Sequence, residues 1–85
     1  MRLKDKVALI TGGTLGIGKA TAKLFIEQGA DVFICGRNQE VGKNAAEELG
    51  CTYSRLDVSD RQAVQGWVEE VFNKTGRIDI LVNNA

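Results

Sequence analysis

Short apolar runs alternate with stretches of helical periodicity along the whole chain. The run VALI at 7–10 contains no polar residue, which is typical of a strand buried on both faces of a parallel sheet. Further apolar runs predict strands at 32–35, 52–56 and 78–82. Between these runs, apolar residues recur three or four positions apart, which is the spacing of helices that pack through one face.

Two helices are predicted at 16–28 and from Asn38 to Gly50. Asn38 is a preferred N-terminal cap, and Gly29 and Gly50 are typical C-terminal stops. The apolar residues at helical spacing in the first helix are Ile17, Ala20, Leu24 and Phe25. In the second helix, the inward residues are expected to be Val41, Ala45 and Leu49.

A third helix has the strongest amphipathic stripe in the chain. Ser59 and Gln62 precede it at capping-box spacing, and Gly76 follows it. Its stripe consists of Ala63, Val64, Trp67, Val68, Val71 and Phe72. The order β-α-β-α-β-α-β, with short loops, implies parallel strands joined by right-handed crossovers. We therefore expect an α/β fold that is the N-terminal part of a Rossmann-type doubly wound parallel sheet.

Composition narrows the function. The 85 residues carry 11 Lys and Arg against 11 Asp and Glu, and this zero net charge argues against nucleic-acid and membrane-surface partners. The absence of histidine excludes a His-based triad and most zinc sites, so no metal site is expected. The apolar run at 7–10 is too short for a signal peptide or a membrane span, and Cys35 and Cys51 suit reduced core thiols. A cytoplasmic protein is expected.

A glycine-rich segment, TGGTLGIG at 11–18, lies between the first strand and the first helix. Gly12 permits a sharp turn off the strand, Gly16 lets the backbone approach a pyrophosphate, and Gly18 lets the helix pack close to the sheet. The free N–H groups and the positive dipole end of the helix favour an anion there. The segment therefore predicts a dinucleotide-binding loop.

Two other interpretations of this segment stay open. Its glycines could serve the turn alone. The residues from Gly13 to Lys19 also fit G-x-x-x-x-G-K, the pattern of a nucleoside-triphosphate loop. That loop requires a Ser or Thr next, where this chain has Ala20, and an Asp at the end of a later strand, where it has Asn83.

The residues after the second predicted strand bear on the choice of cofactor. About 20 positions beyond such a glycine loop, an acid usually accepts a hydrogen bond from the adenosine 2′-hydroxyl. Here the chain has Gly36 and Arg37 instead. A guanidinium suits a 2′-phosphate, so NADP(H) is expected in preference to NAD(H). The alternative is that Arg37 is an ordinary solvated surface arginine.

Three motifs in order resemble the short-chain dehydrogenase/reductase family, in its shorter, NADP-using branch. They are Thr11-Gly12-x-x-x-Gly16-x-Gly18, then Leu56-Asp57-Val58, then Asn83-Asn84-Ala85. The resemblance spans essentially the whole chain. It is strongest toward reductases of the 3-oxoacyl-acyl-carrier-protein type and toward 2,4-dienoyl-CoA reductases.

The resemblance implies roles for particular residues. Those expected beside the pyrophosphate and the nicotinamide are Gly12, Thr14, Leu15, Gly16, Ile17 and Gly18. Asp57, through its carboxylate, and Val58, through its backbone, would border the adenine. Asn84 would lie near a cofactor ribose, while Asn83 would help to hold neighbouring strands. The plainer interpretations are a carboxylate at the start of a helix for Asp57 and a strand-end turn for both asparagines.

The chain departs from the family pattern in two ways. Many NADP-using relatives have a second basic residue at the position of Leu15, so the cofactor prediction depends on Arg37 alone. The family's catalytic Ser, Tyr and Lys, the last two as Y-x-x-x-K, lie beyond residue 85. Tyr53 is followed four residues later by Asp57 and lies in a predicted strand, so it is not expected to be catalytic. No catalytic residue is assigned.

Residues 1–85 are thus expected to form a partial dinucleotide-binding domain that stops before the catalytic half. The expected function is to bind the cofactor of an NADP(H)-dependent oxidoreductase, which transfers hydride to or from a carbonyl or hydroxyl carbon. The substrate would be a small molecule, with acyl thioesters among the candidates, and the full-length protein would be a homo-oligomer. An NADP-binding sensor without catalysis and an inactive truncated product are the alternatives.

Overall fold

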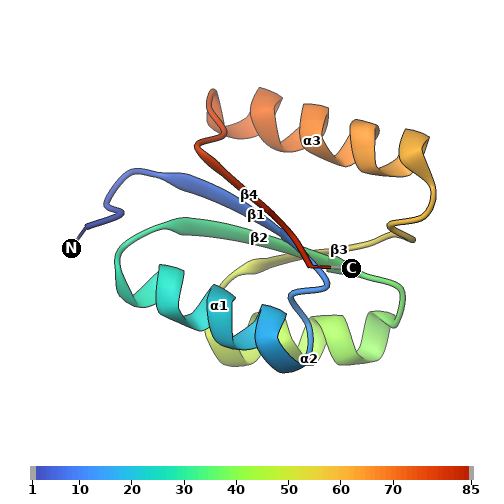
Figure 1. Ribbon diagram of the computed structural model, residues 1–85, viewed down its shortest axis with the longest axis horizontal. Coiled ribbons are helices and arrows are strands. Elements are labelled where there is room, and N and C mark those ends of the chain that lie inside the picture. The colour runs from blue at the N-terminus through green and yellow to red at the C-terminus, as the bar shows by residue number, and fades with distance from the viewer. Residues whose placement is uncertain (1, 85) are drawn as a thin grey trace.

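Four parallel strands form one sheet, with α3 on one face and α1 and α2 on the other (Figure 1). The computed structural model describes residues 2–84. In chain order the elements are β1 (Val7–Thr11), α1 (Gly16–Glu27), β2 (Asp31–Gly36), α2 (Gln39–Leu49), β3 (Thr52–Arg55), α3 (Arg61–Thr75) and β4 (Ile80–Asn83). This alternation confirms the predicted α/β, Rossmann-type architecture.

The strand order is β3-β2-β1-β4. The chain adds β2 and β3 outward from β1, and α3 then carries it back so that β4 pairs with the opposite side of β1. Because the direction of strand addition reverses between β1 and β4, their carboxyl ends form a topological switch point. Ligands of open α/β sheets bind in the crevice outside such a point.

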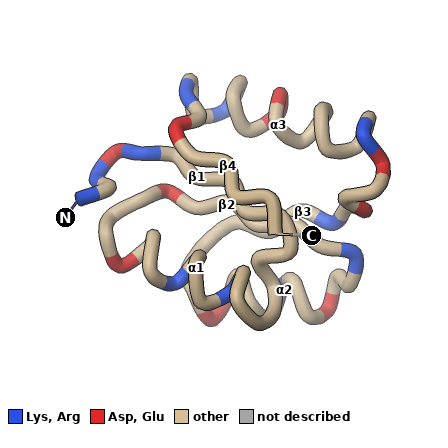
Figure 2. The backbone as a smooth tube through the Cα atoms, viewed as in Figure 1, with Lys and Arg blue, Asp and Glu red and all other residues tan. Residues whose placement is uncertain are grey.

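The core has one layer on each face of the sheet, and β1 contributes to both. Val7 and Leu9 pack with Trp67 of α3, whereas Ala8 and Ile10 pack on the side of α1 and α2. All five residues of β1 are buried, which explains its unbroken apolar run. Charged residues lie mainly on the helices and loops, as Figure 2 shows. Among the described residues, no charged residue is buried in the sheet.

The buried face of α1 differs from the face that apolar spacing suggested. Ile17 and Leu24 are 79% and 55% exposed, whereas Gly18 and Ala22 are buried against the sheet. Small residues face the strands because α1 packs close to them, and larger side chains at those positions would hold the helix away. Of the four apolar residues at helical spacing, Phe25 packs against this core layer as predicted, whereas Ile17, Ala20 and Leu24 are exposed.

The start of α3 also differs from the prediction. The N-terminal cap is Asp60, whose carboxylate accepts a hydrogen bond from the backbone N–H of Ala63 at 3.1 Å. Ser59 lies one residue before this cap, and its hydroxyl donates to the carboxylate of Asp57 at 2.7 Å, so the expected capping box does not form. The inner stripe of α3 is also narrower than predicted, since Phe72 is 52% exposed.

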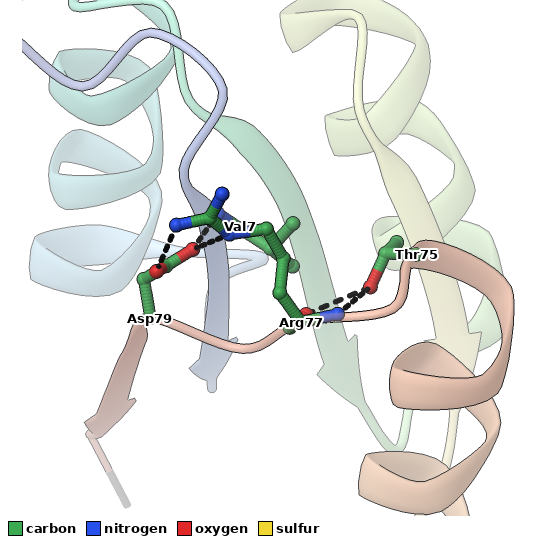
Figure 3. A network of polar contacts seen from close by, with 4 residues as sticks. All are labelled: Val7, Thr75, Arg77 and Asp79. Atoms are coloured by element: carbon green, nitrogen blue, oxygen red, sulfur yellow. Dashed lines mark hydrogen bonds and ion pairs between the residues drawn. The ribbon is translucent and has the colours of Figure 1, made fainter.

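A polar network fixes the start of β4 beside β1, two residues later than the sequence suggested (Figure 3). The backbone N–H of Val7 donates to the carboxylate of Asp79 at 2.8 Å, and the carbonyl of Val7 accepts from the N–H of Asp79 at 2.9 Å. The guanidinium of Arg77 donates to both oxygens of the same carboxylate, at 2.7 and 2.8 Å. Thr75 binds the backbone carbonyl of Arg77 at 2.8 Å and completes the turn out of α3.

The same network predicts a loss of stability in acid. Hydrogen bonds from Arg77 and from Val7 lower the pKa of Asp79 to about 2, below its ordinary value of 3.8. The ionised carboxylate therefore stabilises the fold fully above about pH 4, and this contribution disappears as the pH falls toward 2. Asp79→Asn should lower the melting temperature by several degrees at pH 6 and by little at pH 2.5, in thermal melts followed by circular dichroism.

The control for this test is Glu70→Gln, which removes a carboxylate from an exposed position on α3. It should leave the melting temperature nearly unchanged at both pH values. A loss for Asp79→Asn that is equally large at pH 6 and pH 2.5 would contradict the stabilising role of the ionised carboxylate.

Candidate cofactor-binding site

A groove of about 400 Å³ opens at the carboxyl end of the sheet, around the switch point. It brings together residues from the loops after β1, β2 and β3 and from the end of β4. Its lining residues are Gly12, Thr14, Leu15, Gly36, Arg37, Leu56, Asp57, Val58 and Asn84. Seven of the ten predicted cofactor residues are in this set; Gly16, Ile17 and Gly18 begin α1 beside it.

The glycine loop and the start of α1 pack tightly against the end of β4 at two glycines, Gly12 and Gly18. Gly12 has φ +68°, and a Cβ atom there would overlap the backbone carbonyl oxygen of Asn84. A Cβ atom on Gly18 would overlap the carbonyl oxygen of Gly12 and lie 2.7 Å from the side-chain amide nitrogen of Asn84. Gly12, Gly18 and Asn84 are therefore in direct contact, and the loop, the helix and the end of β4 form one packed unit.

Gly16 has the opposite environment. Its φ is +58°, a left-handed conformation that costs other residues about 1–2 kcal/mol, and no atom of the described residues lies within 4 Å of an ideal Cβ there. The flanking Leu15 and Ile17 are 66% and 79% exposed. A ligand can therefore approach the backbone at Gly16 directly, which is what a pyrophosphate requires of this loop.

The first turn of α1 has no side-chain cap among the described residues. Leu15 occupies the capping position, its side chain has no group that could accept a hydrogen bond, and no acid follows in the first turn. The other two helices are capped, by Asn38 bonding the N–H of Val41 at 3.1 Å and by Asp60 as described above. The N–H groups that begin α1 thus remain available to an anion, and the site fits a pyrophosphate.

Arg37 and Asp57 face one another across the outer part of the groove. An Nη atom of Arg37 lies 3.8 Å from an Oδ atom of Asp57, and 79% of the Arg37 side chain is exposed. The other Oδ atom of Asp57 accepts from the N–H of Ser59 at 2.9 Å and from its hydroxyl at 2.7 Å. These bonds, and then the charge of Arg37, lower the pKa of Asp57, so its carboxylate is ionised at neutral pH.

Thr11 ties the asparagine motif to β1. Its buried hydroxyl lies 3.1 Å from the amide oxygen of Asn83, to which it donates, and accepts from the backbone N–H of Asn84 at 2.9 Å. Asn83 therefore joins two neighbouring strands, as the resemblance implied. The third residue of the motif, Ala85, lies outside the described residues. Thr11 and Leu56 are site residues to which the sequence patterns gave no role of their own.

Tyr53 has a structural role. It lies in β3, donates its hydroxyl to the carbonyl of Gly36 at 2.7 Å, and packs its ring where a Cβ on Gly42 would lie. Burial raises the pKa of its phenol, which disfavours the phenolate that a proton-transfer role would form. The prediction that Tyr53 is not the catalytic tyrosine agrees with this placement.

Lys19 argues against the nucleoside-triphosphate loop. Its ammonium forms an ion pair with the carboxylate of Glu48 at 2.6 Å, which joins α1 to α2. In a triphosphate loop this lysine would reach back to the phosphates. Within residues 2–84, no group of three or more Cys, Asp or Glu side chains could hold a metal ion.

The two cysteines are free. Cys35 packs in the layer beneath α3 and Cys51 in the layer beneath α1 and α2, so the sheet separates them and no disulfide joins them. Burial raises the pKa of the Cys35 thiol to about 11 and also raises that of Cys51. Both are core thiols with little nucleophilic thiolate at neutral pH. No helix among the described residues has the length and apolar character needed to span a membrane.

A family model described as short chain dehydrogenase matches residues 6–85. The chain belongs to the short-chain dehydrogenase family. Its fold agrees with a crystal structure of a short-chain dehydrogenase from Bacillus anthracis, at a TM-score of 0.92 and 40% identity, over 98% of this chain and 35% of that one.

Several curated short-chain dehydrogenases are also similar in sequence. A short-chain dehydrogenase reductase of Arabidopsis thaliana is 45% identical over 99% of this chain and 31% of its own length. A 3-oxoacyl-acyl-carrier-protein reductase of Chlamydia muridarum is 43% identical, over 98% and 36%. An NADP-dependent (R)-specific alcohol dehydrogenase of Lentilactobacillus kefiri is 46% identical, over 99% and 35%. The chain spans about a third of the length of these relatives.

Proposed function

We propose that this segment binds NADP(H) as the cofactor-binding part of an oxidoreductase that transfers hydride to or from a carbonyl or hydroxyl carbon. One observation carries the proposal. Three motifs far apart in the sequence line a single groove at the switch point of the sheet, where open α/β folds bind ligands. Membership of a family of nicotinamide-dependent oxidoreductases supports it.

Each part of the groove suits one part of the dinucleotide. The pyrophosphate would lie against the uncapped N–H groups of α1 and the open backbone of Gly16. Leu56, Asp57 and Val58 would border the adenine, and Asn84 would lie near a ribose. When bound, the cofactor supplies the hydride chemistry; the chain's own residues bind it and set its orientation.

Arg37 is the reason to propose NADP(H) over NAD(H). Its guanidinium has only a weak, exposed ion pair with Asp57, which costs little to replace. A 2′-phosphate would offer it a stronger, charge-assisted partner. The residue before Arg37 is Gly36, so the site lacks the acid that would accept a hydrogen bond from a 2′-hydroxyl and repel a 2′-phosphate. The NADP-dependent alcohol dehydrogenase among the relatives supports the same preference.

For the protein that contains this segment, we propose an enzyme rather than a sensor, since the relatives are named dehydrogenases and reductases. Its catalytic Ser, Tyr and Lys would lie outside residues 1–85. Its substrate would be a small carbonyl or hydroxyl compound, with an acyl thioester suggested by the similar 3-oxoacyl-acyl-carrier-protein reductase. We further propose a cytoplasmic homo-oligomer without nucleic-acid or membrane partners.

Arg37→Ala tests the cofactor assignment. NADPH binding should weaken about 10-fold or more, because a charge-assisted contact is lost, whereas NADH binding should change less than about twofold. Dissociation constants would be measured by isothermal titration calorimetry. Lys4→Ala is the control, since it removes one positive charge from the segment before β1, at the amino end of the strands and away from the groove. Equal losses for NADPH and NADH in Arg37→Ala would refute the role of Arg37.

A further inference from the structure

A second guanidinium lies beside Arg37, on the neighbouring strand. Arg55 is the last residue of β3, and in the parallel sheet it pairs with Gly36, the last residue of β2. Parallel strands end at the same edge, so Arg55 comes next to the residue that follows Gly36. Its Nε atom donates to the backbone carbonyl of Arg37 at 3.2 Å.

Hydrogen bonds from β3 and the residue after it fix the backbone of Gly36 and Arg37, where the chain leaves β2. The carbonyl of Gly36 accepts from the hydroxyl of Tyr53 at 2.7 Å and from the N–H of Leu56 at 3.1 Å. The carbonyl of Arg37 accepts from Arg55. The backbone that presents the Arg37 side chain is therefore positioned by β3, and Arg55 supplies the outermost of these bonds.

The charge of Arg55 is not used inside the described structure. Arg37, Lys19 and Arg77 each pair with a carboxylate, whereas Arg55 forms no ion pair with any residue from 2 to 84. Arg55 and Arg37 line a common hollow of about 420 Å³ beside the groove. Two cations thus line one hollow beyond the carboxyl ends of β2 and β3.

Two carboxylates also line this hollow, but each is already engaged. Asp57 accepts two hydrogen bonds from Ser59, and Asp60 accepts from the first turn of α3. One oxygen of each carboxylate is thus occupied by these donors. The Arg37–Asp57 pair, at 3.8 Å, is long and exposed. A phosphate, with a charge of about −1.5 to −2 at neutral pH, would compete for Arg37 successfully.

We propose that Arg55 is a second determinant of cofactor choice, acting as a cation toward the 2′-phosphate and as a positioning residue for Arg37. The inference rests on the proposed binding of NADP(H). The glycine loop carries no basic residue from Gly12 to Gly18, so Arg55 supplies the second positive charge of the site from β3.

The test uses two nucleotides that differ only in the 2′-phosphate, 2′,5′-ADP and 5′-AMP. Their dissociation constants would be measured by calorimetry for the unchanged chain and for Arg55→Ala, Arg55→Gln and Arg55→Lys. Position 55 is exposed, and far-UV circular dichroism with a thermal melt would verify that each variant folds. Arg55→Gln keeps a donor for the Arg37 carbonyl without the charge, and Arg55→Lys keeps the charge without the planar fork.

Arg55→Ala should weaken 2′,5′-ADP binding about 10-fold and 5′-AMP binding less than about twofold. Arg55→Gln should weaken 2′,5′-ADP binding less than alanine does, because it keeps a donor for the Arg37 carbonyl and loses only the charge. Arg55→Lys should retain most of the affinity. Unchanged 2′,5′-ADP binding in Arg55→Ala, with a loss in Arg37→Ala, would overturn the role of Arg55 and leave the proposed function intact. Equal affinity of the unchanged chain for the two nucleotides, or no binding of either, would overturn both.

Discussion

Gly18→Ala is expected to destabilise the fold and to abolish dinucleotide binding, although it adds one methyl group to a helix. The added Cβ would overlap the backbone carbonyl oxygen of Gly12 and crowd the side chain of Asn84. A backbone atom cannot move aside as a flexible side chain does, so α1 must shift away from the sheet. Overpacking of this kind typically costs about 1–3 kcal/mol, and a domain of this size loses about 4–8 °C of melting temperature per kcal/mol.

Gly66→Ala is the matched control for this prediction. Gly66 also lies in a helix, α3, but no atom of the described residues comes within 4 Å of an ideal Cβ there. Alanine should therefore stabilise the chain by about 0.5–1 kcal/mol, because it restricts the unfolded chain and favours the helix. Thermal melts and NADPH titrations of both variants would provide the comparison. A Gly18→Ala variant as stable as Gly66→Ala would show that α1 and the glycine loop are not packed as described.

The elements that the sequence predicted well are those whose pattern depends on one local cause. β1 is buried on both faces, so its first four residues form an unbroken apolar run that identified it as a buried strand. Gly50 and Gly76 end α2 and α3 as expected, each in a left-handed conformation. The alternation of strands and helices predicted parallel strands, and all three strand pairs of the sheet are parallel.

The errors arose where a contact distant in sequence, or a competing bond, decided the outcome. The inner face of α1 carries Gly18 and Ala22 because the helix lies close to β1, and apolar spacing alone favoured larger residues. Ser59 is a residue type that often caps helices, yet its hydroxyl binds Asp57, and Asp60 caps α3 instead. A local pattern could not reveal which of these bonds would form.

The candidate site shows the same division. The glycine loop and Arg37 could be proposed from the sequence because their order and spacing are typical of dinucleotide-binding units. Arg55 was not recognisable, because an arginine at the end of a weak strand is usually a solvated surface residue. Its position beside Arg37 depends on the pairing of β3 with β2 in register, and only the folded sheet provides that.

Gly36→Asp is expected to reverse the cofactor preference of the site. An aspartate at the end of β2 would accept from the 2′-hydroxyl of NADH and repel the 2′-phosphate of NADPH. We expect the ratio of NADPH to NADH affinity to fall by roughly 100-fold, since about 10-fold each comes from the new repulsion and from the new ribose contact. The backbone can accept the change: Gly36 has no positive φ, and its new Cβ would lie 3.2 Å from a methyl carbon of Thr14, which must move by a few tenths of an ångström.

Gly36→Asn distinguishes the charge from the added bulk. Asparagine has nearly the same shape as aspartate and contacts Thr14 in the same way, but it carries no charge to repel a phosphate. It should therefore reduce NADPH affinity far less than Gly36→Asp does, in parallel calorimetric titrations with NADPH and NADH. If both variants lose both cofactors equally, the effect is steric, and the end of β2 does not face the adenosine ribose. If only Gly36→Asp favours NADH, the absence of an acid at position 36 contributes to the preference for NADP(H).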